Sequence, residues 1–168
     1  MSITGLTTKA VSKSGSNKSQ TPEKEPFSYK ILIVDDEQDL GLVYKTILEE
    51  AGFNVDVFND PQVALSKIRD TYPSILDTTP SAAKITKPYD LLLLDIKMPT
   101  MNGFELYREI KKIMGKNYSV KVCFITAYEV YYEQLKEDFP KIGIACFIKK
   151  PISDDDLIKR VKQELLEE

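Results

Sequence analysis

The amino-acid sequence predicts an α/β fold, in which a doubly wound parallel sheet of five strands carries helices on both faces. Two observations predict it. Short continuous apolar runs alternate along the chain with segments whose apolar residues recur at helical spacing. Each apolar run also ends abruptly at polar or charged residues, as strands do at the edge of a buried sheet.

The first two strands and helices are predicted between residues 31 and 71. The run 31–34 is apolar throughout, which suits a strand buried on both faces. A helix follows, which Gly52 ends, and its apolar face is formed by Leu40, Val43, Tyr44, Ile47 and Leu48. Residues 55–58 predict a second strand. Asp60 then caps a helix that has Pro61 in its first turn and Ala64, Leu65 and Ile68 on its apolar face.

The middle of the chain predicts two more strands around a helix. Residues 91–94 form an apolar strand that ends at Asp95. A helix begins at Asn102 or Gly103, and its expected apolar side carries Phe104, Tyr107, Ile110 and Ile113. Residues 122–125 form the fourth strand, which ends at Thr126.

The last part of the chain predicts a helix of poor pattern over about 128–138 and a fifth strand over 144–148. Ser153 and Asp156 resemble a capping box, although such a box prefers Glu or Gln at the second position. The final amphipathic helix presents Leu157, Ile158, Val161 and Leu165. Right-handed crossovers then favour the flavodoxin-like strand order 2-1-3-4-5, which places ligands outside the carboxyl ends of the strands.

The domain is expected to span residues 29–168. Residues 1–28 consist largely of Ser, Thr, Lys and Pro, so we expect a disordered tail, with a docking arm as the alternative. Residues 72–88 form a connection much longer than the usual ~2–6 residues of α/β units, and therefore an insertion. A solvated loop is the simplest interpretation of this insertion, and partner recognition is the alternative.

Composition excludes several classes of function. The net charge is −3 and no basic stripe stands out, so we expect no direct contact with nucleic acid. No apolar segment is long enough to span a membrane and no signal peptide is present, which predicts a cytoplasmic protein. The chain has no histidine, which excludes Ser-His-Asp and Cys-His catalysis. Cys123 and Cys146 lie in apolar runs, where buried thiols are favoured and a disulfide is the alternative.

Five residues at the strand ends carry the candidate chemistry. They are Asp35, Asp36, Asp95, Thr126 and Lys150, and the predicted topology brings them to one edge of the sheet. Carboxylates held close together repel one another, and a divalent cation such as Mg²⁺ relieves that repulsion. A carboxylate also serves as a nucleophile toward a phosphoryl group, whose charge a lysine and a threonine hydroxyl stabilise.

The segments ILIVDDE, LLLLDIKMPTMNGFEL, VCFITAY and CFIKKPI, each at a strand end and in this order, resemble the response-regulator receiver family. The resemblance covers residues from about 29 to 168, except the insertion. It implies that Asp95 is the phosphoacceptor. It also implies that Asp35, Asp36 and Asp95 bind Mg²⁺ (or Mn²⁺), together with the backbone carbonyl of Lys97.

The resemblance assigns further roles around the phosphoryl group. Thr126 is implied to be the switch hydroxyl, and Ala127 lines the access route to the site. Lys150 is implied to bind the phosphate, and its bond to Pro151 is expected to be cis. Phe147 falls at the aromatic switch position. Lys97 and Tyr128 fall at positions that tune loss of the phosphoryl group.

These assignments imply a two-component or phosphorelay response regulator that is not an enzyme beyond its own Mg²⁺-dependent phosphorylation and dephosphorylation. A histidine kinase or a phosphotransfer protein donates the phosphoryl group. The phosphorylated form then binds a protein target through the face formed by the fourth helix, fifth strand and fifth helix. We expect a stand-alone, chemotaxis-regulator-like receiver without an output domain, either a monomer or a phosphorylation-dependent homodimer, with no membrane partner.

Alternatives from other functional classes fit the sequence less well. A haloacid-dehalogenase-type phosphatase needs a second acid two residues after its nucleophile, where this chain has Lys97. A flavodoxin needs a phosphate loop after the first strand, but the acidic residues 35–37 repel phosphate when no metal is bound. A pseudo-receiver, which binds partners without phosphorylation, remains the alternative. The simplest structural interpretation takes the same acids as helix caps and the others as ordinary strand-end residues.

Overall fold

The computed structural model describes residues 29–71, 88–115, 119–127 and 146–166. Within these ranges, five strands pair in parallel in the order β2-β1-β3-β4-β5, which confirms the predicted fold class. The strands are β1 (Lys30–Val34), β2 (Asn54–Phe58), β3 (Leu91–Asp95), β4 (Lys121–Thr126) and β5 (Cys146–Lys149). The described helices are α1 (Gln38–Glu50), α2 (Pro61–Thr71), α3 (Gly103–Met114) and α5 (Asp154–Leu166).

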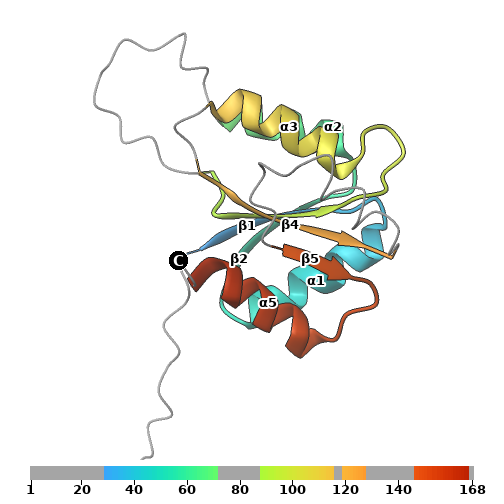
Figure 1. Cartoon of the computed structure of the whole chain (residues 1–168), viewed down its shortest axis with the longest axis vertical. Helices are drawn as coiled ribbons and strands as arrows, with labels where there is room; N and C mark the ends of the chain where they lie inside the picture. The colour runs from blue at the N-terminus through green and yellow to red at the C-terminus, as the bar shows by residue number, and fades with distance from the viewer. Residues whose placement is uncertain (1–28, 72–87, 116–118, 128–145, 167–168) are drawn as a thin grey trace, which may run out of the picture.

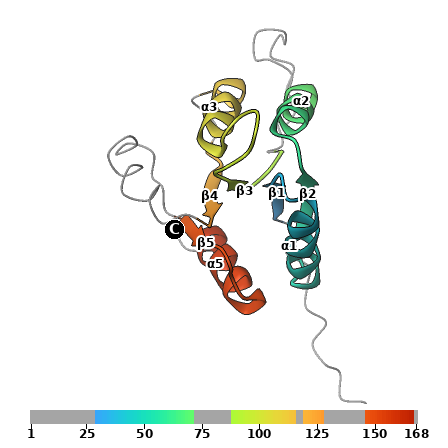
Figure 2. The same ribbon diagram turned by 90° about the vertical axis from the view of Figure 1, so that its right-hand side faces the viewer.

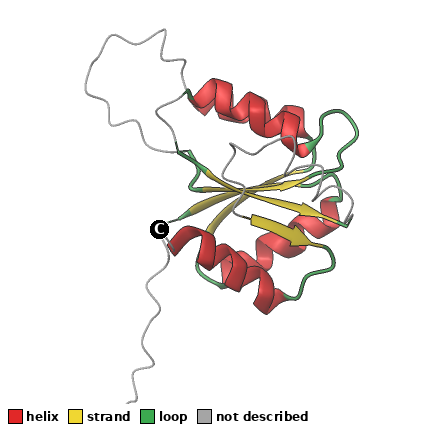
Figure 3. Cartoon of the chain, viewed as in Figure 1, coloured by secondary structure: helices red, strands yellow, loops and turns green. Residues whose placement is uncertain are grey.

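Helices cover both faces of the sheet (Figures 1 and 3). On one face, α2 and α3 pack over a buried cluster that includes Leu32, Val34, Leu92, Leu94 and Phe124. On the other face, α1 and α5 pack over Ile31, Ile33, Leu91, Leu93 and Ile125. Figure 2 shows the two helix pairs on either side of the strands. Alternate residues of the central strands therefore enter different cores, which is why β1 is apolar over residues 31–34 and β3 over residues 91–94.

Local signals set the helix ends. The Asp60 side chain accepts a hydrogen bond from the Gln62 N–H (2.7 Å), as a cap should. Gly52 has a φ of 96° just after α1, a conformation that costs glycine little. At the start of α5, the Ser153 hydroxyl accepts a bond from the Asp156 N–H (3.2 Å). The Asp156 carboxylate accepts from that hydroxyl rather than from a backbone N–H, so the box is incomplete.

The apolar side of α3 differs from the prediction. Leu106 and Met114 are fully buried, whereas Phe104 and Ile113 pack only partly buried against the same cluster. The buried residues Gly103, Leu106, Tyr107, Ile110 and Met114 follow the helical repeat, whereas the predicted positions, each three residues apart, drift around the helix. The predicted helix over 128–138, the tail 1–28 and nearly all of the insertion lie outside the described residues.

The expectation of free thiols is wrong in this structure, because Cys123 and Cys146 are joined in a disulfide. Both residues are fully buried, as predicted. They are direct partners in the β4–β5 register, and their Cα atoms lie 4.4 Å apart, within disulfide range. The apolar pattern of each strand predicts the burial but not this register, so the sequence alone left the bond open.

Candidate functional site

The carboxyl ends of the strands are held together by backbone hydrogen bonds that continue beyond the regular ladders. The Asp35 N–H donates to Phe58 O (3.2 Å), and the Ile96 N–H donates to Ile125 O (3.1 Å). The Lys150 N–H donates to Thr126 O (2.8 Å). These bonds bring the residues that follow β1, β3, β4 and β5 to one edge of the sheet.

Three carboxylates meet at this edge. Oxygen atoms of Asp35, Asp36 and Asp95 all lie within 4.8 Å of one another. Asp35 is 0% exposed and Asp95 is 5% exposed, whereas Asp36 is exposed. The strand therefore turns one member of the acidic pair into the protein and the other toward solvent.

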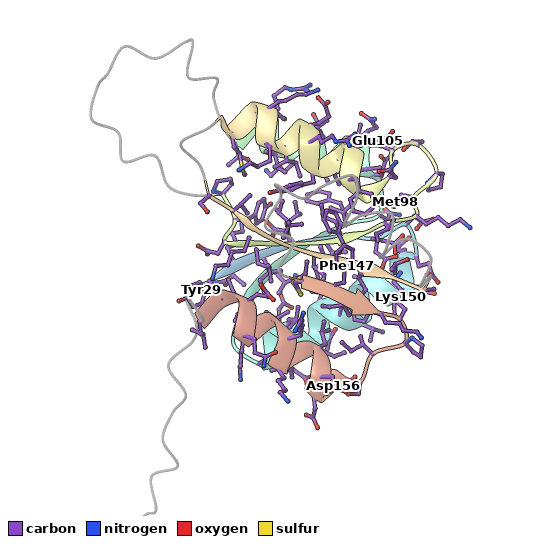
Figure 4. The ribbon with its side chains drawn as sticks, viewed as in Figure 1. Tyr29, Met98, Glu105, Phe147, Lys150 and Asp156 are labelled. Carbon is purple, nitrogen blue, oxygen red and sulfur yellow. A yellow bond between two sulfur atoms is a disulfide. The ribbon has the colours of Figure 1, made fainter. Side chains whose placement is uncertain are left out.

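The Lys150 ammonium links this cluster. Its Nζ lies 2.8 Å from Asp35 Oδ2 and 3.0 Å from Asp95 Oδ1. A third carboxylate, Glu37, lies 3.4 Å from the same Nζ and is largely exposed. Figure 4 shows Lys150 at the end of β5, with Phe147 further back along the same strand. The sequence-based assignment of the binding lysine to Lys150 rather than Lys149 fits this arrangement.

Burial and charge shift the proton affinities in the cluster. Burial raises the pKa of Asp95 to about 6, and the negative charges of Asp35 and Asp36 add to this, while Lys150 opposes it. Burial lowers the pKa of Lys150, but its hydrogen bonds and attraction to Asp35 and Asp95 outweigh burial, so this pKa is raised overall. Lys150 is therefore charged at neutral pH, and Asp95 is ionised above about pH 6.

The residues present fit a Mg²⁺ ion. The three carboxylates outnumber Lys150, so the cluster keeps net negative charge at neutral pH. Within the described residues, the buried Asp35 Oδ2 has only the Lys150 ammonium close to it as a polar partner. Mg²⁺ prefers carboxylate oxygens as ligands. The charge of these carboxylates is not fully neutralised by Lys150, so a bound cation would compensate the rest.

A cleft of about 580 Å³ opens above Asp95. The residues that line it come from the ends of β1, β3, β4 and β5: Asp36, Glu37, Asp95, Lys97, Met98, Pro99, Thr126, Ala127 and Lys150. Thr126 is 7% exposed and borders the cleft beside Asp95. The cleft is therefore large enough to admit a small group to the carboxylate of Asp95.

The loop after β3 is tied back to the site by α3. The Gly103 N–H donates to Ile96 O (3.1 Å). A Cβ at residue 103 would lie 2.3 Å from Asp95 O, so only glycine allows the helix to approach this closely. The start of α3 therefore fixes the backbone of the candidate acceptor.

The structure brings together most of the predicted site residues. Asp35, Asp36, Asp95, Thr126, Ala127 and Lys150 meet at the cleft, and Lys97 lies on its border. Phe147 lies apart from them, half-buried and stacked on Phe124 with ring centroids 5.8 Å apart. The peptide bond between Lys150 and Pro151 is cis, as the resemblance implies. Tyr128 lies outside the described residues.

The sequence reasoning missed two residues of the site. Glu37 contacts Lys150, and its place directly after the acidic pair was the available signal. Gly103 contacts the backbone of Asp95, and its signal was a glycine at the very start of a predicted helix, where other residues are stronger helix formers.

The match to known proteins covers nearly the same residues as the predicted domain. The family described as response regulator receiver domain matches residues 31–162. The response regulator ArlR of Staphylococcus epidermidis is 30% identical over 136 residues, which are 80% of this chain and 52% of that protein. A CpxR homolog of Haemophilus influenzae is 31% identical over 138 residues, or 79% of this chain and 48% of that protein. The chain thus spans about half the length of these curated relatives.

Solved structures share the fold. A CheY-like receiver domain protein from Methanospirillum hungatei has a TM-score of 0.62 and 27% identity, covering 82% of this chain and 94% of that one. The response regulator TrrA from Thermotoga maritima, solved in complex with Mg²⁺-BeF, has a TM-score of 0.60 and 29% identity, covering 82% and 99%. In the described part of the chain, no helix is long and apolar enough to cross a membrane.

Proposed function

Because the chain belongs to the response regulator receiver domain family of two-component systems, we propose that it accepts a phosphoryl group on Asp95 and uses it to switch protein binding. The observation that carries this proposal is the position of Asp95. Its carboxylate lies at the base of an open cleft, 3.0 Å from Lys150 and beside Asp35 and Asp36. Within the proposal, residues 29–168 form the receiver domain, with an insertion over about 72–88.

The acceptor chemistry needs an ionised Asp95. The pKa of about 6 leaves this carboxylate charged at neutral pH, so an oxygen lone pair is available to attack phosphorus. The bond between phosphorus and its donor atom breaks as the bond from phosphorus to an Asp95 oxygen forms. A histidine kinase or a phosphotransfer protein is the proposed donor, with an N–P bond as the bond that breaks.

Charge at the cleft then stabilises the transferred group. Mg²⁺ held by Asp35, Asp36, Asp95 and the Lys97 carbonyl would supply positive charge to the phosphoryl oxygens. Lys150 already lies against Asp95 and would pair with a phosphoryl oxygen instead. The Thr126 hydroxyl would donate a hydrogen bond to the same group. Thermotoga maritima TrrA, at 29% identity, was solved in complex with Mg²⁺-BeF, which supports Mg²⁺ as a ligand of the proposed site.

The proposed response passes from Thr126 to β5. Lys149 pairs with Thr126 in the register, and Phe147 stands two residues earlier on the same strand. Movement of the Thr126 hydroxyl toward a phosphoryl group would shift this strand pair and the Phe147 ring. The surface of β5 and α5, together with the segment between β4 and β5, is the proposed contact for a protein target. Phosphorylation-dependent pairing of two copies through the same surface belongs to this proposal.

Acetyl phosphate tests the proposal directly. Incubation of the protein with acetyl phosphate and Mg²⁺ should add one phosphoryl group to the intact mass, and chelation of the metal should abolish the gain. Asp95→Asn should remove the gain. Asp39→Asn, which changes an exposed carboxylate on α1, should leave it intact.

Two results would contradict the proposal. An unmodified wild-type mass in the presence of Mg²⁺ would make the chain a pseudo-receiver. A mass gain that persists in Asp95→Asn would move the acceptor to another side chain.

A separate assay addresses Tyr128. We propose that its ring hinders the approach of water to phosphorylated Asp95, so Tyr128→Ala should lose phosphate faster than wild type.

A further inference from the structure

The disulfide between Cys123 and Cys146 lies next to the switching residues of the proposed function. The two cysteines face each other on neighbouring strands, and the next rung of the same ladder pairs Phe124 with Phe147. Two rungs further on, Thr126 pairs with Lys149. The cross-link therefore joins β4 to β5 within the same short stretch that carries the switch hydroxyl and the switch aromatic.

The neighbouring rungs point to opposite cores. Cys123 and Cys146 are 0% exposed on the face covered by α1 and α5. Phe124 and Phe147 pack on the face covered by α2 and α3, with their rings stacked. A covalent bond on one face thus fixes the spacing of the strands at the position where the aromatic pair on the other face has to move.

We propose that Cys123 and Cys146 form a reversible redox couple that sets how readily the phosphorylation switch operates. In the oxidised form, the bond closes a loop between residues 23 apart in sequence and restrains the β4–β5 pair in the arrangement described here. In the reduced form, the pair moves more freely, and Thr126 and Phe147 reach the switched arrangement at lower cost. This inference rests on the proposed function of Asp95.

The reaction that interconverts the two forms is thiol–disulfide exchange. A small thiol of the glutathione class, as its thiolate, bonds to one cysteine sulfur, and the Cys123–Cys146 bond breaks. A second such thiolate then attacks the mixed disulfide. One small disulfide leaves, and the two cysteine sulfurs end as thiols after taking up two protons. Two electrons have moved from the small thiols to the protein.

The surroundings of Cys123 and Cys146 affect the rate of thiol–disulfide exchange. A Glu164 carboxylate oxygen lies within 4.8 Å of both sulfurs, and Glu164 is only partly buried. Its negative charge disfavours a thiolate at either cysteine, and burial acts in the same direction. A cysteine whose thiolate is disfavoured is a poor leaving group during reduction and a poor attacking group during reoxidation, and both sulfurs are buried, so we expect the redox state to change slowly.

The cysteine content of the chain simplifies a test of this proposal. Cys123 and Cys146 are its two cysteines, so every thiol-dependent effect of the wild type belongs to this pair. We would titrate beryllofluoride with Mg²⁺ into oxidised and reduced full-length protein, with Cys123→Ala/Cys146→Ala as the control. The reduced form should bind about 5-fold more tightly, and the control should bind equally under both conditions.

Thermodynamic linkage between reduction and beryllofluoride binding gives a second measurement, the reduction potential of the pair. If reduction favours binding, beryllofluoride with Mg²⁺ must favour reduction by the same factor, and 5-fold corresponds to about 20 mV for a two-electron couple. Equilibration in glutathione buffers with and without the phosphoryl mimic measures this shift. A melting temperature that falls on reduction, with no difference in binding and no shift in potential, would overturn the proposal and leave a structural disulfide.

A ligand-free measurement separates this proposal from the proposed function. Hydrogen exchange at the Lys150 amide, which donates to Thr126 O, should be faster after reduction. Absence of beryllofluoride binding in both redox states would overturn the acceptor role of Asp95 and the coupling with it. Unchanged exchange at Lys150 would overturn redox control of the strand pair even if phosphorylation is normal.

Discussion

Lys150 determines how much uncompensated negative charge the cleft contains before any metal binds. Its ammonium lies within ion-pair distance of Asp35, Asp95 and Glu37, and its side chain is 9% exposed. The first two partners are buried, so their charges have little access to water. Removal of one partner from a buried ion pair is far more costly than removal of an exposed one.

Lys150→Met should therefore lower the free energy of unfolding by about 3 kcal/mol at pH 7 without Mg²⁺, because Asp35 is left buried without its cation. Saturating Mg²⁺ should restore part of the loss, since a bound cation again compensates the carboxylates. Urea unfolding with and without Mg²⁺ measures both effects. Lys149→Met is the matched control, and an equal loss in that variant would show that the effect is not specific to residue 150.

The sequence predicted Asp35, Asp95 and Lys150 as members of this cluster, but not Glu37 and not how each side chain is placed. The acidic pair after β1 was recognisable as a unit, yet Asp35 is buried and Asp36 exposed. That difference depends on the direction in which the strand ends, which spacing does not determine. Glu37 was missed because strand-end reasoning places the acidic pair but does not say that the next, largely exposed side chain turns toward Lys150. Long-range side-chain contacts of this kind depend on the topology being formed first.

At the scale of elements, the close approach of α3 to β3 holds the backbone of Asp95, the proposed acceptor, in place. Asn102 and Glu105 complete a capping box, which stabilises the start of α3 one residue before Gly103. The helix can begin there because residue 103 has no side chain facing Asp95 O. A single glycine thus couples the position of an entire helix to the position of the acceptor backbone.

Gly103→Ala should destabilise the protein by about 2–3 kcal/mol, because its Cβ would lie 2.3 Å from a backbone oxygen that cannot move alone. It should also slow phosphorylation by acetyl phosphate, since relief of the clash moves Asp95. Gly41→Ala is the matched control, because its nearest contact is a methyl group of the half-buried Val57 side chain at 3.1 Å rather than backbone. The helix propensity gained there offsets the tighter packing, so a net change below about 1 kcal/mol is expected. Similar urea midpoints for the two variants would contradict this account.

The elements themselves were well predicted because their signals are local. The apolar runs located all five strands, and Asp60, Gly52 and Ser153 marked helix ends through bonds or φ values that the structure shows. The exact buried face of α3 was missed because positions spaced three residues apart drift around a helix, whereas the buried Leu106, Ile110 and Met114 are spaced four apart. The β4–β5 register, which pairs Cys123 with Cys146, is likewise a tertiary property.

For the molecule as a whole, the charged groups that line the cleft lower the stability of the fold. The sheet brings ionisable groups to one edge, where burial penalises their charges. Apolar or neutral residues at the ends of β1 and β3 would avoid this penalty. The acidic edge is therefore a strained part of an otherwise well-packed domain, and ligands that bring positive charge should stabilise the whole fold.

Asp95→Asn should make the metal-free protein more stable at pH 7–8, by about 2 kcal/mol, as measured by urea unfolding. The pKa of Asp95 is raised from its ordinary value of 3.8 to about 6, so the folded state holds this proton more tightly than the unfolded chain. The stability contributed by the protonated group is fully present below pH 3.8 and is lost as pH rises through about 6. The advantage of asparagine should accordingly shrink between pH 6 and pH 4. Mg²⁺ should reverse the order at pH 7, because it stabilises the wild type through a ligand that the variant lacks. A variant less stable than wild type at pH 8 without metal would show that Lys150 outweighs burial at this carboxylate.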